Sequence, residues 1–86
     1  MKPLELNSAD YRIQSASIWH NRDGEVFRCT LTPVTDEVLE ALDAAARSKR
    51  MIRLIFPNHW LGLQCIEAVR SEPGCVRIAG RVVEAH

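Results

Sequence analysis

The fold is decided by residues 32–50, which read TPVTDEVLEALDAAARSKR. Thr35 has the side chain of a helix N-cap, and the two carboxylates after it favour the helix dipole. A single buried stripe is predicted at helical spacing by Val38, Leu42 and Ala45. The basic residues that end the segment suit a helix C-terminus. We therefore expect one helix of about 13–15 residues, lying across one face of a sheet.

The residues before this helix have the pattern of a β-hairpin. Apolar and polar side chains alternate over Tyr11–Trp19 and again over Glu25–Leu31, which predicts two strands. Residues 20–24 are the expected turn, because their Asp-Gly pair provides the positive φ of a tight hairpin. The alternation slips in the first strand, so we expect a β-bulge near Ser15–Ser17.

Three further strands are expected after the helix. Residues 51–56 are apolar on both faces apart from Arg53, which favours a central strand. The other two strands are predicted over residues 60–70 and 75–83, with turns before each. Residues 1–9 form either a loose arm or an extra edge strand around Leu4–Leu6.

These elements predict an α+β fold in the order β-β-α-β-β-β. Short strands with frequent turns favour a small curved antiparallel sheet or a partly open β-barrel, with one helix packed on it. The order is similar to that of small barrels of the OB or SH3-like kind. A chain of 86 residues can build one core, so residues 1–86 are expected to be a single domain.

The charge balance bears on the kind of partner. Eleven basic residues equal eleven acidic ones, which argues against strong non-specific binding to nucleic acid. Residues 1–46 carry four basic and eight acidic groups, and residues 47–86 carry seven basic and three acidic groups. A net charge of zero leaves little repulsion between copies, so we expect self-association, most simply as a homodimer. No apolar run is long enough to cross a bilayer, so we expect no membrane partner.

The residue types that usually form catalytic and metal sites are scattered. Cys29, Cys65 and Cys75 are odd in number and lie in apolar patterns, which indicates reduced thiols in a cytoplasmic protein. The three histidines form no close pair with a cysteine or with each other, so we expect no metal and no cofactor. We also expect no catalytic residue; an enzyme that uses Cys75 or a histidine is the third hypothesis.

The first functional hypothesis is a non-enzymatic protein-interaction or assembly module. Trp19 and Trp60 lie at strand ends, and tryptophans in such places are typical anchors of interfaces. The expected partner-binding residues are therefore Trp19, Trp60 and the neighbouring His59.

The alternative is a small barrel that binds nucleic acid. Its phosphate-binding residues would be Arg47, Lys49, Arg50 and Arg53, and Trp60 would stack on a base. The same basic residues also complement the dipole at the end of the helix, which is the simpler interpretation.

Overall fold

The computed structural model describes residues 2–22 and 24–86, and it has the α+β architecture that the sequence predicts. In chain order the elements are β1 (Leu4–Asn7), the short 3-10 helix η1 (Ser8–Asp10), β2 (Arg12–Asn21), β3 (Gly24–Thr32), α1 (Asp36–Ser48), β4 (Met51–Ile55), β5 (Trp60–Glu72) and β6 (Cys75–Ala85). The predicted strands and helix are thus all present, with ends that differ by a few residues.

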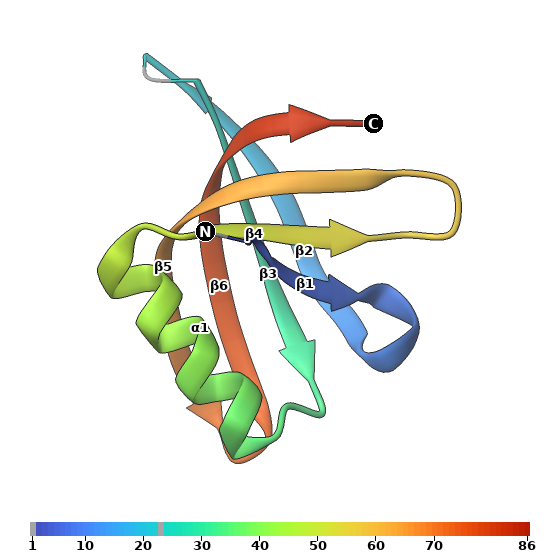
Figure 1. Cartoon of the computed structure of the whole chain (residues 1–86), viewed down its shortest axis with the longest axis vertical. Helices are drawn as coiled ribbons and strands as arrows, with labels where there is room; N and C mark the ends of the chain where they lie inside the picture. The colour runs from blue at the N-terminus through green and yellow to red at the C-terminus, as the bar shows by residue number, and fades with distance from the viewer. Residues whose placement is uncertain (1, 23) are drawn as a thin grey trace.

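The six strands form one sheet in the order β1-β4-β5-β6-β3-β2 (Figure 1). The sheet does not close into a barrel, since β1 and β2 are its two edges. η1 joins the end of β1 to the start of β2, so the two open edges approach each other at that side of the molecule (Figure 1). β1 runs parallel to β4, and every other pairing is antiparallel. The sheet is therefore mixed, whereas the sequence predicts an antiparallel sheet.

The sheet is strongly curved because its two longest strands bend together. β5 and β6 are 13 and 11 residues long, and their pairing contains three register shifts. Bulges of this kind bend a strand pair and increase its twist. Gly80 lies in the bent region, where an added Cβ would approach the Cβ of Leu63 to 2.8 Å. The close approach of β5 and β6 therefore requires a glycine at this position.

The core lies between α1 and the inner face of the sheet. Leu42 and Ala45 are fully buried and Val38 is half-buried, which confirms the stripe predicted for the helix. The strands contribute alternate residues to the same core: Leu6, Phe27, Cys29, Leu31, Ile52, Leu54, Leu63, Cys65, Val76 and Ile78. The residues between them consequently face outward, on the side opposite α1.

Both ends of α1 are capped by side-chain and backbone contacts. Thr35 is the N-cap, as predicted, and its Oγ1 accepts a hydrogen bond from the backbone N–H of Val38 at 3.2 Å. Lys49 ends the helix in the left-handed conformation with φ 55°, and its N–H bonds to the carbonyl of Ala45. The single α-helix of residues 2–22 and 24–86 is too short and too polar to cross a membrane.

The predicted hairpin is formed by β2 and β3. Their register shifts between Gln14 and Ser17, and Ser15 has a φ of 53°, which confirms the bulge. β2 extends to Asn21, so the first residues of the predicted turn belong to the strand instead. Asp23 of the Asp-Gly pair lies outside the described residues, and Gly24 has the expected positive φ of 118°.

Candidate functional site

β2 is an edge strand that exposes large apolar side chains. It pairs with β3 on one side, and no strand of the described chain pairs with its other side. Trp19 is 60% exposed and Ile18 is 50% exposed. Successive residues of a strand point to opposite faces, so a strand added to β2 would meet an apolar side chain on each face. Main-chain pairing at such an edge is a common mode of peptide recognition.

The straight part of β2 begins after the bulge. Residues 17–21 pair in regular register with residues 24–28 of β3. Trp19 lies opposite Val26, and its indole N–H donates a hydrogen bond to Oγ of Ser17 at 3.1 Å. This bond holds the ring along its own strand while most of its surface stays accessible.

The outer face beside this edge carries four exposed arginines. Arg28 alternates with the core residues of β3, and Arg77 and Arg81 alternate with those of β6, so all three point outward. The register places Arg28 opposite Ala79, between the two arginines of β6. Arg12 of β2 lies on the same face. We call these four residues the outer arginines.

None of the outer arginines has a carboxylate partner in the described chain. The ion pairs of residues 2–22 and 24–86 are those of Arg47 with Asp43, Arg53 with Glu5, and Arg70 with Asp36. Arg81 instead donates a hydrogen bond to Oε1 of Gln64 at 2.9 Å. None of these positive charges is therefore held in an ion pair within the described residues, although Glu67 of β5 lies opposite Ala79 in the same row as Arg28.

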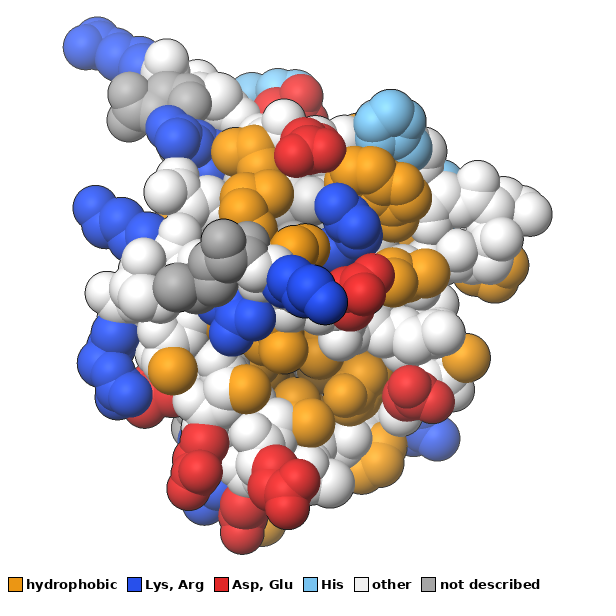
Figure 2. Space-filling view, in the orientation of Figure 1, with side chains coloured by type: hydrophobic (Ala, Val, Ile, Leu, Met, Phe, Trp, Pro, Cys, Tyr) orange, Lys and Arg blue, Asp and Glu red, His pale blue; other side chains and the backbone are white. Residues whose placement is uncertain are grey.

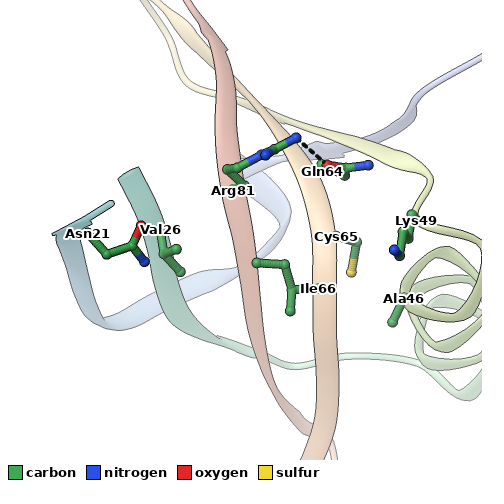
Figure 3. Close-up of a pocket in the computed structure, with 8 residues that line it drawn as sticks. All are labelled: Asn21, Val26, Ala46, Lys49, Gln64, Cys65, Ile66 and Arg81. Atoms are coloured by element: carbon green, nitrogen blue, oxygen red, sulfur yellow. Dashed lines mark hydrogen bonds between the residues drawn. The ribbon is translucent and has the colours of Figure 1, made fainter. Parts of the chain in front are cut away.

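An open pocket of about 500 Å³ lies between the end of α1 and the β2–β3 hairpin (Figure 3). Lys49 extends into it from the helix end, and Asn21 and Val26 line it from the hairpin. The hydrogen-bonded pair of Arg81 and Gln64 lies between these two walls (Figure 3).

A second hollow, of about 300 Å³, continues from this pocket to the sheet edge. It shares Asn21 and Val26 with the pocket and adds Trp19, His20 and Arg28. The two hollows meet at Asn21 and Val26 and together form a groove that runs from the end of α1 to β2. Its walls combine positive charge with an exposed aromatic ring.

Trp60 and His59, which the sequence predicts as partner-binding residues, lie at the start of β5 and in the turn before it, and β6 and β3 separate β5 from β2 in the sheet. The guanidinium of Arg53 lies 4.4 Å from the centre of the Trp60 ring, and the His86 ring lies 4.6 Å from it. The backbones of Trp60 and His86 also exchange two hydrogen bonds, at 2.7 and 2.9 Å. His59 stacks on Phe56 at 4.7 Å. Trp60 is half-buried, and both rings already have intramolecular partners.

The basic cluster predicted at the helix end is largely engaged with neighbouring groups. Arg47 pairs with Asp43 at 2.9 Å, and the guanidinium of Arg50 donates two hydrogen bonds to the carbonyl of Lys2, at 3.0 and 2.8 Å. Arg53 lies over Trp60, as described above. Lys49 alone among these cations lines the pocket.

The cysteines are unpaired, and burial suppresses the reactivity of two of them. Burial raises the pKa of the Cys29 thiol to about 12, and it also raises the pKa of Cys65. Both thiols are therefore protonated at neutral pH and are poor nucleophiles. Cys75 is half-buried. Within the described residues, no three side chains of the metal-binding types come together as a metal site.

The outer arginines are the candidate residues that sequence analysis missed as a group. The alternation around Arg28, Arg77 and Arg81 already shows that each faces outward. Their assembly depends on β3 and β6 being neighbours, and no local pattern encodes that pairing.

Comparisons with known proteins do not assign this surface to a family. No protein-family model matches the chain, and no curated protein or solved structure is significantly similar to it.

Proposed function

We propose that this protein is a non-enzymatic interaction module that binds a protein partner along β2. The observation that carries the proposal is the free edge of β2, where Ile18 and Trp19 are half or more exposed. Exposed edges favour pairing with another chain, and proteins without such a partner usually protect them.

Strand addition would use both the backbone and the side chains of this edge. Residues 17–20 form a regular stretch of an edge strand, which can add main-chain hydrogen bonds on the side away from β3. Trp19 provides a large and nearly rigid contact surface beside it, which is the property of an interface anchor. The unpaired thiols, two of them in the core, support a reducing compartment such as the cytoplasm.

Site-specific photo-crosslinking in the producing cell tests the proposal. A photoreactive phenylalanine analogue at position 19 keeps an aromatic ring at the edge, and we expect it to form a discrete adduct with a protein. The matched control carries the analogue in place of Val83, a residue of β6 that is 42% exposed and lies outside the groove. Equal adducts at the two positions, or none at position 19, would contradict binding along β2.

A second candidate is binding of single-stranded nucleic acid to the outer face. The outer arginines have no carboxylate partners, and Trp19 lies at the end of the groove that contains Arg28. Cations beside an exposed aromatic ring suit a single strand, whose bases stack while its phosphates pair. The salt dependence of binding to a labelled single-stranded oligonucleotide distinguishes this candidate from the first.

A further inference from the structure

The charge of the β2 edge restricts the kind of partner that can pair with it. Residues 12–22 contain two basic residues, Arg12 and Arg22, and no acidic residue. On the neighbouring strand Glu25 lies opposite His20, and Arg28 adds a positive charge between the two arginines of β6. The edge and the face beside it are therefore basic, although the whole chain has a net charge of zero.

We infer that the occupant of this edge is an extended acidic segment of another protein, added as a strand beside residues 17–20. This inference rests on the proposed function and names the chemistry of the partner. A strand in this position would place alternate side chains on the outer face, near Trp19 and within reach of the long side chain of Arg28. Carboxylates at those positions would meet unpaired guanidinium groups. The other face would offer Ile18 to an apolar side chain.

A second copy of the chain fits this edge less well. Pairing of two β2 strands would bring two basic edges together, and residues 12–22 contain no carboxylate that could neutralise their arginines. Like charges across a strand pair are destabilising, and charged residues on an edge are a recognised protection against self-pairing. The edge charge thus disfavours the homodimer expected from net charge alone.

A nucleic acid also fits less well than a peptide. It can use the outer arginines and the face of Trp19, but it cannot form the repeated hydrogen-bond ladder of a strand edge. Ile18 points to the opposite face of β2 and would not contribute to its binding. An acidic peptide strand uses all three features.

Fluorescence anisotropy with synthetic peptides tests the inference on the full chain. The probe is a labelled peptide of about seven residues that alternates glutamate with valine, long enough to span residues 17–20. Two control peptides replace glutamate by lysine, or carry N-methyl groups on alternate amides so that the pairing edge is blocked. We expect both controls to bind at least about tenfold more weakly, and the backbone amide resonances of residues 17–20 to shift only with the acidic peptide.

Matched protein variants locate the charge effect. Arg28→Glu should weaken binding of the acidic peptide at least about tenfold, because it reverses a charge beside the edge. Arg47→Glu makes the same charge change at a residue of α1 that pairs with Asp43 and lines neither hollow, and it should have less than about a threefold effect. The acidic and control peptides are compared on the unsubstituted protein, so that comparison holds even if one variant folds poorly.

Four results would overturn the inference. Equal binding of the acidic and lysine peptides, with loss on Trp19→Ala, would retain the edge as a binding site but reject its charge preference. A protein adduct formed by the photoreactive residue at position 19, without binding of the acidic peptide, would retain the proposed function and reject the acidic partner. Tighter binding of a single-stranded oligonucleotide that displaces the peptide would assign the surface to nucleic acid. Dimerisation abolished by Trp19→Ala would assign the edge to a second copy.

Discussion

At the scale of single residues, the three cysteines behave according to where alternation places them. Cys29 and Cys65 are each 1% exposed, in line with the core residues of β3 and β5. The thiols occupy the volume of small apolar side chains, and burial opposes their ionisation. The position of Cys29 can therefore be read from the pH dependence of stability.

The free energy of unfolding should fall as pH rises above 9 because of Cys29. The thiol has a pKa near 9.0 when unfolded and about 12 in the fold, so above pH 9 the unfolded state loses a proton that the folded state keeps. The stabilisation is complete below pH 9 and is lost as pH approaches 12, with a slope of up to about 1.4 kcal/mol per pH unit. Urea denaturation of the wild type and Cys29→Ala across this range measures the difference. If the unfolding free energies of the wild type and Cys29→Ala changed in parallel with pH, the thiol would be solvated in the fold.

At the scale of the elements, the local signals of α1 agree with its surroundings. Its N-cap, first-turn carboxylates and apolar stripe are present in the sequence and are used in the structure as expected. An isolated helix of 13 residues is marginal in water, so its stability depends on packing against the sheet. Figure 1 shows α1 lying along β5, where Leu42 enters the core.

Leu42→Ala should be among the most destabilising substitutions in the chain. Leu42 is fully buried, and truncating a leucine in such a site typically costs about 2–5 kcal/mol. Leu39→Ala is the matched control, because Leu39 is half-buried on the same helix and should cost less. Chemical denaturation measures both. A loss below about 1 kcal/mol for Leu42→Ala would show that the helix packs through another face.

At the scale of the whole molecule, the opposite charges occupy different regions. Figure 2 shows a group of acidic side chains at the lower end, by the start of α1, while basic side chains lie mainly along the left and in the upper half, where a few acidic side chains are interspersed. The net charge of the chain is zero, but strand pairing places four arginines on the outer face over β2, β3 and β6. Local charge of this kind selects partners by complementarity, while the overall balance limits long-range attraction to polyanions.

We expect no measurable binding to single-stranded nucleic acid at about 150 mM salt. Each neutralised phosphate contributes about −0.7 to the slope of log K against log salt, so the few outer arginines should give only weak binding at low salt. Fluorescence anisotropy with a labelled oligonucleotide, repeated across a salt series, measures the slope. Micromolar binding at about 150 mM salt that is lost with Arg28→Glu and with Trp19→Ala would instead establish the second candidate function.

The sequence by itself determined the elements of this protein and the face to which most side chains point. The N-cap at Thr35, the bulge near Ser15 and the outward direction of Arg28 all follow from properties of residues close in the chain. Their prediction succeeds because backbone preference and the alternation of burial act over a few residues.

Tertiary structure alone decided which of these elements became neighbours. It placed β1 parallel to β4, brought Arg28 between Arg77 and Arg81, and enclosed Trp60 between Arg53 and His86 while leaving Trp19 at a free edge. Several strand orders satisfy the same local patterns. The choice among them depends on how the bent strands and α1 together bury one core, and that burial is a property of the whole chain.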